Sequence, residues 1–241
     1  MADHSGAGDS FGAGVAALIP ARLGSTRLPR KALADLGGEP MVVRVWRAVV
    51  ACPRFEQVKV VTDADEIESA VRTAGGEVVR VDAPCRSGTE RVARAAAALD
   101  TRWIVNVQGD MPGLGHEHLD ALVDLLEAGA ELATIAAPLE PAHRDAASAV
   151  KVVSDARGRA LYFSRAPIPG ALHVGLYGFR RATLLRLLDL PRSALAEAED
   201  LEQLDWLHAG LEVQVGVVRT APLAVDTPAD LERARAFFAR S

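Results

Sequence analysis

The stretch LIPARLGSTRLPRKAL, residues 18–33, joins a short apolar run to a loop rich in positive charge. The run over 14–20, GVAALIP, ends at a proline, which is typical of a buried strand followed by a loop. The loop then carries four cations, Arg22, Arg27, Arg30 and Lys31. In α/β proteins, ligands bind where strands end at their carboxyl termini. The stretch therefore predicts a first strand with a charged site at its end.

Apolar strands and amphipathic helices alternate along the rest of the chain. Further strands are expected over 58–63, 77–81, 102–110, 131–139, 149–155, 160–165, 173–180 and 212–218. Helices are expected over 39–52, 64–76, 87–100, 195–210 and 227–240. Thr89 is placed to cap the third of these helices, and Thr227, followed by Pro228, to cap the last. This order predicts an α/β fold with a mixed, mainly parallel central sheet flanked by helices, and a smaller β-rich lobe in the second half.

Composition limits the class of protein. The 241 residues are 49% hydrophobic and 24% charged, which is ordinary for a folded chain, and we expect one domain over 15–241 after a flexible tail over 1–14. A net charge of −5 argues against nucleic acid or a membrane surface as partner, since both need a broad basic field. Two cysteines form no disulfide framework, and no run approaches the roughly 20 apolar residues of a membrane span. We expect a cytoplasmic protein.

The basic loop is suited to binding phosphates. Gly24 lets the backbone approach a ligand closely, and a loop with successive free N–H groups makes an anion site. The hydroxyls and cations that could follow a triphosphate are Ser25, Thr26, Arg22, Arg27 and Lys31. Neither GxxxxGK[ST] nor GxGxxG is present, so the loop is neither a P-loop nor a dinucleotide fingerprint. A merely solvated basic loop stays the alternative.

Two aspartates follow predicted strands. Asp110 ends VNVQGD and Asp226 lies in LAVDTPADL. Each alone is explained equally well by turn chemistry or helix capping. A triphosphate, however, arrives with Mg²⁺, which takes carboxylate oxygens and keeps several waters. A basic loop with two such carboxylates indicates a Mg²⁺-dependent transfer at a nucleotide phosphorus.

Eight stretches, in order from Ile19 to about Arg235, carry a resemblance to a known family: IPARLGSTRLPRKAL, TDADEI, RSGTERV, VNVQGD, VKVVSDARGRALYFSRAPIP, HVGLYGFRR, LEQLDWL and VDTPADLERAR. Together they resemble the CMP-Kdo synthetases, the 3-deoxy-manno-octulosonate cytidylyltransferases. The loop alone is shared by the wider sugar nucleotidyltransferases, whereas the ordered set is far more specific.

The resemblance implies a Rossmann-like nucleotidyltransferase fold, a homodimer, and a reaction of CTP with an acidic acceptor that gives a CMP-linked product and pyrophosphate. It implies that the acceptor oxygen attacks the α-phosphorus in line while Mg²⁺ and Lys31 stabilise the developing charge. The catalytic residues it implies are Arg22, Lys31, Asp110 and Asp226, of which the two aspartates hold the metal. The nucleotide-binding residues are Ala21, Arg22, Gly24, Ser25, Thr26, Arg27, Lys31, Thr62, Asp63, Arg86, Ser87, Gly88 and Gln108. The acceptor-binding residues are Gln108, His173, Tyr177, Glu202 and Gln203.

The chain departs from this family at four places. Arg30 stands where the family usually has glycine, Cys85-Arg86 where it has a histidine-glutamine pair, and Met111 where it has an acidic residue. Only residues 170–172 fill a segment that is markedly longer in the family. Because that segment borders the family's sugar pocket, and the two arginines add positive charge, we expect a smaller and more anionic acceptor, such as phosphonoformate. The eight-carbon octulosonate is the alternative.

Other interpretations are open. Met111 would suit a CTP-binding sensor or partner protein without turnover, although Lys31, Asp110 and Asp226 all remain. A CMP-sialate synthetase shares the loop, but SGTER and ALYFSRAPIP argue against it. A glycosyltransferase would need a DxD motif after a buried strand, and DAD at 63–65 instead begins a helix.

Some conspicuous side chains have simpler explanations. His116 and His118 are two residues apart, so on a helix they face different directions and make poor joint metal ligands. We expect both at the surface. Trp46 and Trp206 are expected in the core rather than as stacking platforms for a base.

Overall fold

The computed structural model describes residues 14–25 and 28–239. Thr26, Arg27 and nearly all of the expected tail over 1–14 lie outside the described residues. The strands of the described part are β1 (Val15–Pro20), β2 (Gln57–Thr62), β3 (Glu77–Arg80), β4 (Trp103–Asn106), β5 (Leu132–Ala137), β6 (Lys151–Ser154), β7 (Ala160–Ser164), β8 (Ala171–Arg180) and β9 (Gln214–Val217). The α-helices are α1 (Met41–Val50), α2 (Asp65–Thr73), α3 (Gly88–Ala96), α4 (His116–Glu127), α5 (Pro141–Arg144), α6 (Arg181–Arg186), α7 (Ala194–Glu199), α8 (Gln203–His208) and α9 (Pro228–Phe238). Two 3₁₀ turns span Lys31–Leu33 and Leu187–Asp189.

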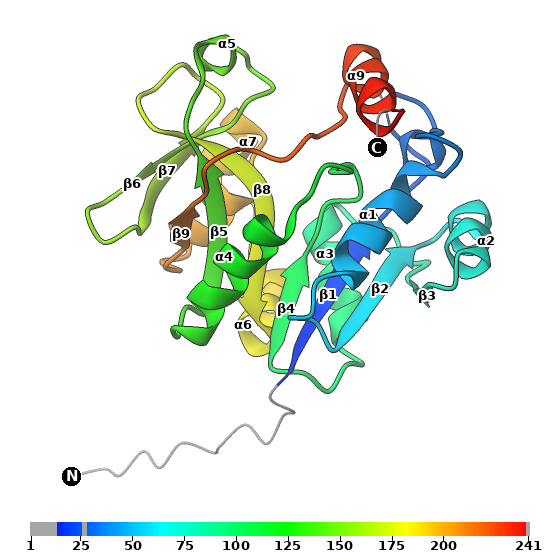
Figure 1. Ribbon diagram of the computed structural model, residues 1–241. Coiled ribbons are helices and arrows are strands. Elements are labelled where there is room, and N and C mark those ends of the chain that lie inside the picture. The colour runs from blue at the N-terminus through cyan, green and yellow to red at the C-terminus, as the bar shows by residue number, and fades with distance from the viewer. Residues whose placement is uncertain (1–13, 26–27, 240–241) are drawn as a thin grey trace.

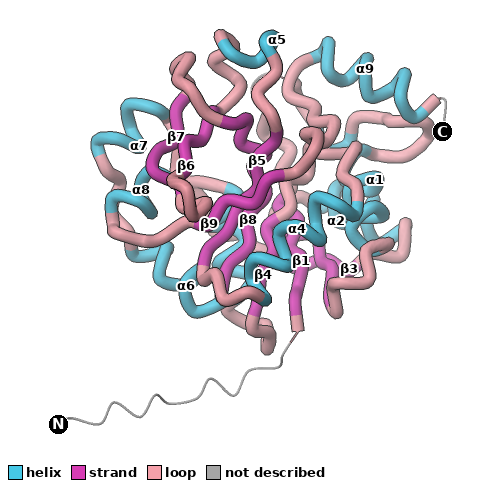
Figure 2. The backbone as a smooth tube through the Cα atoms, turned by 60° about the vertical axis from the view of Figure 1, so that its left-hand side comes forward, coloured by secondary structure: helices cyan, strands magenta, loops and turns pink. Residues whose placement is uncertain are grey.

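All nine of these strands join one mixed sheet in the order β3-β2-β1-β4-β8-β5-β9, with β6 and β7 attached through β8 (Figure 1). The four strands from the first half of the chain pair in parallel. β8 lies antiparallel between β4 and β5, and β9 runs parallel to β5 at the edge. The β6–β7 hairpin extends the sheet on one side (Figure 2). The expected β-rich lobe is thus continuous with the main sheet.

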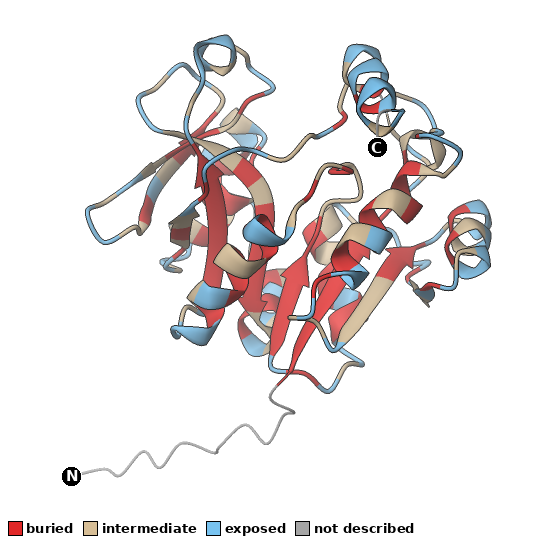
Figure 3. Cartoon of the chain, in the orientation of Figure 1, coloured by how far each residue is buried: buried red, intermediate tan, exposed pale blue. Residues whose placement is uncertain are grey.

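The apolar run of β1 is unbroken because the strand is covered on both faces. Side chains of successive strand residues point to opposite faces, and here Ala17 and Ile19 face one core while Ala16 and Leu18 face another. Figure 3 shows the central strands as the most continuously buried part of the chain. A strand buried on both sides needs no alternation of polar residues, which is why the sequence marks it so clearly.

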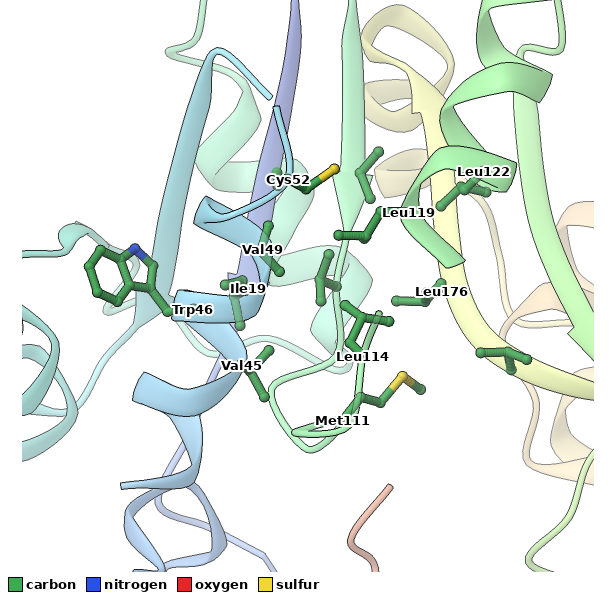
Figure 4. Packing of buried hydrophobic residues seen from close by; sticks show 14 of the residues in the cluster. Ile19, Val45, Trp46, Val49, Cys52, Met111, Leu114, Leu119, Leu122 and Leu176 are labelled. Atoms are coloured by element: carbon green, nitrogen blue, oxygen red, sulfur yellow. The ribbon is translucent and has the colours of Figure 1, made fainter. Parts of the chain in front are cut away.

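Helices cover the two faces of the sheet. One core lies beneath α1, α2 and α4, where the packing includes Val45, Val49 and Leu122 (Figure 4). The opposite core lies beneath α3, α6, α7 and α8 and includes Trp206. Trp46 and Trp206 are both buried, as expected. No helix in the described stretches combines the length and apolar character needed to cross a bilayer.

A third, smaller core joins the two ends of the chain. It contains Leu36 and Met41, which follow the basic loop, and Val225, Leu231 and Ala234 from the C-terminal segment and α9. Burying these side chains together fixes α9 beside the turn that carries the loop's last cation. This core therefore places the basic loop next to the segment that precedes α9.

Several expected elements differ from the observed ones. The helix expected over 195–210 is two helices, because Asp200 adopts a left-handed conformation (φ 51°) that ends α7. The strand expected over 102–110 ends at Asn106. α4 and α6 were not expected. α4 does carry apolar residues at helical spacing, Leu119, Leu122, Val123 and Leu126, so this pattern was overlooked, whereas α6 has only six residues and too few turns to show one.

The helix caps were predicted with mixed success. Thr227 caps α9 with Pro228 in its first turn, as expected, and accepts a hydrogen bond from the Asp230 amide (3.2 Å). The third helix is capped by Ser87 rather than Thr89, through a hydrogen bond from the Glu90 amide (3.1 Å). Thr89 is instead buried, and its hydroxyl donates a hydrogen bond to the Glu202 carboxylate.

His116 and His118 differ in their exposure to solvent. His116 is exposed as expected, but His118 is buried, with the side chain's two ring nitrogens hydrogen-bonded. The expectation that both lie at the surface was wrong for His118, because the loop before α4 and a distant segment close over it.

Candidate active site

Lys31 brings the two predicted carboxylates together. Its ammonium donates hydrogen bonds to Asp110 Oδ2 (2.6 Å), to Asp226 Oδ1 (3.1 Å) and to the Val225 carbonyl (2.9 Å). These acids are 79 and 195 positions away from Lys31 in the chain. The basic loop and the two aspartates therefore form one cluster.

The two aspartates keep Lys31 charged. The Lys31 side chain is only 15% exposed, and burial alone would lower its pKa. The charges and hydrogen bonds of Asp110 and Asp226 outweigh that effect and raise the pKa of Lys31 above its ordinary value. Lys31 is therefore an ammonium at neutral pH. The aspartates remain partly open to solvent, with 30% and 44% of their side chains exposed.

Neither aspartate lies on a regular element. Asp110 follows β4 by four residues, and Asp226 lies between β9 and α9. A backbone hydrogen bond from the Val225 amide to the Asp110 carbonyl (2.9 Å) joins the two segments directly beside their carboxylates. The pair is thus held by contacts between loops rather than by strand register.

A cavity of about 260 Å³ opens beside the cluster. Ten of the predicted site residues line it: Ala21, Arg22, Gly24, Ser25, Lys31, Ser87, Gly88, Gln108, Asp110 and Asp226. Three predicted nucleotide-binding residues do not line it: Thr62, Asp63 and Arg86. Predicted residues Thr26 and Arg27 fall outside the described residues. Gly88 and Gly109 allow the backbone to lie close to Pro20, since an added Cβ would come 3.3 Å and 3.0 Å from that residue.

Arg91 is a site residue that the sequence interpretation missed. It is 5% exposed, lines the cavity, and donates to Asp63 Oδ2 (2.7 Å) and to the Val81 carbonyl (2.9 Å). Asp63 thus acts through Arg91 instead of lining the cavity. Thr62 is fully buried and accepts a hydrogen bond from the Ala64 amide (3.1 Å). The sequence could have shown this residue, because Arg91 in RSGTERV lies on the otherwise apolar, buried face of α3.

A second cavity, of about 530 Å³, adjoins the first and shares Ser87, Gln108 and Asp226 with it. All five predicted acceptor-binding residues line it: Gln108, His173, Tyr177, Glu202 and Gln203. The two cavities meet at Asp226. A group bound in the second can therefore approach a nucleotide bound in the first.

His173 presents a neutral ring to this second cavity. The Thr134 hydroxyl donates to the Leu176 carbonyl (2.6 Å), so the contact between Thr134 Oγ1 and His173 Nε2 (3.0 Å) requires the ring to donate. Burial lowers the pKa of His173 to about 3. The ring is therefore uncharged at neutral pH, with its other nitrogen an acceptor.

Burial also dominates at Tyr177 and Glu202. It raises the pKa of Tyr177 well above the ordinary value, and the Glu202 charge adds to this effect. It raises the pKa of Glu202 too, against hydrogen bonds from the Thr89 and Ser87 hydroxyls. The hydrogen bond from Thr89 to Glu202 (2.5 Å) links the first turn of α3, beside the first cavity, to the residue that precedes α8, beside the second. Tyr177 also packs edge-on against Trp206, with ring centroids 5.0 Å apart.

The two departing arginines differ in their relation to the cavities. Arg30, in a left-handed conformation (φ 58°), forms an ion pair with Glu66 of α2 and lines neither cavity. Arg86 lines the second cavity and pairs with Glu90 (3.0 Å), which also pairs with Arg94 (2.8 Å). The expectation that these arginines attract a more anionic acceptor therefore loses its basis at Arg30 and keeps part of it at Arg86.

Met111 belongs to the core. It is 7% exposed and packs in the cluster beneath α4, where its side chain lies near Leu114 and Leu176 (Figure 4). It lines neither cavity. An apolar residue at this position therefore removes no group that faces the nucleotide, and the argument for a catalytically silent sensor is weakened.

The chain does not supply a complete metal cage. In the described parts of the chain, no three His, Cys, Asp or Glu side chains cluster closely enough to hold an ion. Two carboxylates that converge on one cation do match the chemistry of Mg²⁺, which often takes one or two carboxylates and completes its shell with water and substrate phosphates. The donor set therefore fits Mg²⁺ bound together with a nucleotide.

Comparison with known proteins identifies the family. A cytidylyltransferase family model matches residues 16–213, which covers both cavities except for the Asp226 segment. The chain belongs to the cytidylyltransferase family. Within it, this cytidylyltransferase belongs with the CMP-Kdo synthetases: it is 48% identical to a 3-deoxy-manno-octulosonate cytidylyltransferase of Azorhizobium caulinodans, over 93% of this chain and 96% of that one. A protein of the same name from Parvibaculum lavamentivorans is 44% identical over 92% of each chain.

Solved structures of similar fold support the same family. A CMP:2-keto-3-deoxy-manno-octonic acid synthetase complexed with CTP superposes with a TM-score of 0.90 at 34% identity, over 95% of this chain and 99% of that one. A cytidylyltransferase from Leptospira borgpetersenii, at 20% identity and a TM-score of 0.67, shares the fold. The Rossmann-like nucleotidyltransferase fold and the cytidylyltransferase activity are therefore confirmed.

Proposed function

We propose that this cytidylyltransferase transfers CMP from CTP to 3-deoxy-manno-octulosonate and releases pyrophosphate. The observation that carries the proposal is the near-full-length likeness to proteins of that name, together with a TM-score of 0.90 to a synthetase of that acid. This likeness supports the eight-carbon acid, the alternative in our sequence interpretation, over phosphonoformate.

The second cavity supports the larger acid. Its volume of about 530 Å³ is twice that of the cavity beside Lys31, and a one-carbon acid would leave most of it filled with water. The ion pair of Arg30 with Glu66, away from both cavities, weakens the charge argument for the smaller acid.

We propose that CTP occupies the cavity beside Lys31, with its phosphates along the basic loop and its base near Ser87 and Gly88. Asp110 and Asp226 would hold Mg²⁺, which supplies Lewis-acid neutralisation of phosphate charge when bound. Lys31 carries a fixed positive charge beside both carboxylates and would stabilise charge on the phosphoryl group. His173, Tyr177, Glu202 and Gln203 would orient the acceptor so that its oxygen faces the α-phosphorus.

We also propose that the enzyme is a homodimer. Val217, the last residue of β9, is 76% exposed, and Leu161 on β7 is 60% exposed in the same lobe. Large exposed apolar side chains in one lobe favour burial against a further chain. Sedimentation of the wild type and of Val217→Asp tests this: a dimer that weakens in the variant supports the proposal, and a wild-type monomer contradicts it.

An acceptor screen tests the main proposal. The purified enzyme is given CTP and Mg²⁺ with either octulosonate or phosphonoformate, and pyrophosphate release is measured. We expect release with octulosonate at a kcat/KM far above that for phosphonoformate. Pyrophosphate release with phosphonoformate but not with octulosonate would make phosphonoformate the acceptor. CTP binding without pyrophosphate release with either acid would point to a third acceptor.

A further inference from the structure

His118 is a buried imidazole that the proposed chemistry does not use. It lies in the first turn of α4, 2% exposed, and its ring contacts two segments that are far apart in the sequence. Nδ1 lies 3.0 Å from the Gly115 amide nitrogen, and Nε2 lies 2.9 Å from the Thr220 carbonyl oxygen. A carbonyl oxygen can only accept, so Nε2 carries the hydrogen. The Gly115 amide lies in position to donate to Nδ1, so both ring nitrogens have a partner.

The Thr220 carbonyl belongs to the segment that delivers Asp226. After β9, residues 219–226 form neither helix nor strand and cross to α9 over the loop that follows β4 (Figure 1). The end of the segment is held at α9, where the Asp226 amide donates to Asp230 Oδ2 (3.0 Å) and Val225 is buried in the third core. The position of the rest of the segment depends on its contacts with the loop that it crosses.

Three hydrogen bonds join the segment to the residues that follow β4, up to the first turn of α4. His118 Nε2 donates to the Thr220 carbonyl, the Gly113 amide donates to the Leu223 carbonyl (3.1 Å), and the Val225 amide donates to the Asp110 carbonyl (2.9 Å). The partners run in opposite directions along the two segments, like rungs of an antiparallel ladder. Two rungs are backbone to backbone, and only the His118 rung depends on a side chain.

The packing between the two segments is close. A Cβ added at Gly113 would come 2.5 Å from the Leu223 Cβ, a distance that real side chains do not reach. The last rung lies directly beside the carboxylates that share Lys31. A loosening at the first rung therefore reaches Asp226 through a short and otherwise irregular segment.

We propose that His118 is a positioning residue that holds the 219–226 segment so that Asp226 meets Asp110 beside Lys31. The role rests on the proposed function of Asp226 in holding Mg²⁺. α4 packs on β5 and β8, so the ring is mounted on a rigid support. Fixing the segment before substrate binds removes the entropy cost of assembling the carboxylate pair at each turnover.

Two conservative variants separate this role from simple helix capping. In His118→Asn the amide oxygen can replace Nδ1 as acceptor for the Gly115 amide, but nothing reaches Thr220. In His118→Gln the amide nitrogen can replace Nε2 as donor to Thr220. If His118 only stabilised the start of α4, the Asn variant would behave like the wild type. If it holds the segment, the Gln variant is the one that is rescued.

Amide hydrogen exchange over residues 219–226 is the primary readout, because it requires neither metal nor substrate. We expect exchange at Val225 to rise about fivefold in His118→Asn and to stay near the wild-type rate in His118→Gln. Gly113→Ala, which displaces Leu223 at the next rung, should raise it further. Unchanged exchange in His118→Asn alongside faster exchange in Gly113→Ala would overturn the proposal.

Kinetics then link the segment to function. The Mg²⁺ concentration for half-maximal pyrophosphate release should rise roughly fivefold in His118→Asn, with kcat at saturating Mg²⁺ nearly unchanged. A fall in kcat that excess Mg²⁺ does not restore would contradict a positioning role. Failure of the acceptor screen would leave the exchange result intact, so the two proposals can fail separately.

Discussion

The ionisable side chains of the two cavities have pKa shifts with opposite causes. In the first, the charges of Asp110 and Asp226 outweigh burial and raise the pKa of Lys31, and all three side chains remain partly accessible to water. In the second, burial shifts the pKa of His173 downward and those of Tyr177 and Glu202 upward. Burial of this kind disfavours the charged form of each group, whereas pairing favours it.

The difference matches what each half would bind. A triphosphate carries several charges that cations and a metal must neutralise, so that half keeps its own charges paired until substrate arrives. An acceptor rich in hydroxyl groups needs neutral donors and acceptors in fixed positions. Replacing a group in the first half should therefore affect turnover most, and in the second half selectivity and pH dependence.

The largest effect is expected at Asp226. Asp226→Asn removes one of the two carboxylates proposed for Mg²⁺, and turnover should fall about a thousandfold. CTP binding, measured by calorimetry, should remain detectable because the loop is intact. Asp124→Asn, which changes an exposed acid on α4 paired with Arg54, is the matched control and should retain full activity. An unchanged rate in Asp226→Asn would remove this residue from the metal site.

Lys31→Ala should come next. It leaves two carboxylates facing each other without their shared cation, and it removes the fixed charge proposed for the phosphoryl group. We expect kcat/KM to fall about a hundredfold, with weaker CTP binding. Lys59→Ala, which breaks a lysine ion pair between β2 and β3, tests whether any lysine loss has this effect. Equal activities in the two variants would mean that the Lys31 cluster is structural.

His173 predicts a specific dependence of stability on pH. Its pKa is about 3 in the folded chain and near 6.5 when unfolded, so between these values the unfolded chain binds a proton that the folded chain does not. Acidification from pH 6.5 to 4.5 should therefore lower the free energy of unfolding, by about 2 kcal/mol or less from this group. Urea unfolding of the wild type and His173→Gln measures it. The variant should lose less stability, and parallel curves would argue against a buried neutral ring.

The smallest effect is expected at Arg30. Arg30→Gly breaks an exposed ion pair with Glu66 and relieves a left-handed conformation that glycine adopts freely. We expect kcat/KM for each acid to stay within about twofold of the wild type. Competition between octulosonate and phosphonoformate gives the sharper readout. A shift of preference toward octulosonate would show that Arg30 acts on the acceptor after all.

Much of the fold could be predicted from local patterns. β1 is a continuous apolar run ending at Pro20, and such a strand can only be buried on both faces. Thr227 and Pro228 start α9 by a chemistry that depends on neighbouring residues alone. The helix expected over 195–210 was wrong for an equally local reason. Asp200 breaks an apparently continuous helical pattern through one backbone conformation that no periodicity reveals.

The candidate site divides in the same way. The sequence by itself identified the residue types for a phosphate loop and a carboxylate pair, because strand ends and charge patterns can be read along the chain. Only the tertiary structure decided that Lys31, Asp110 and Asp226 meet, that Met111 turns into the core, and that His118 reaches Thr220. The physical reason is that each of these contacts joins residues far apart in the chain and involves at least one loop residue, such as Asp110, Met111, Thr220 or Asp226. Sheet order and the small core beneath α9 bring those segments together, and neither can be read from any one stretch of sequence.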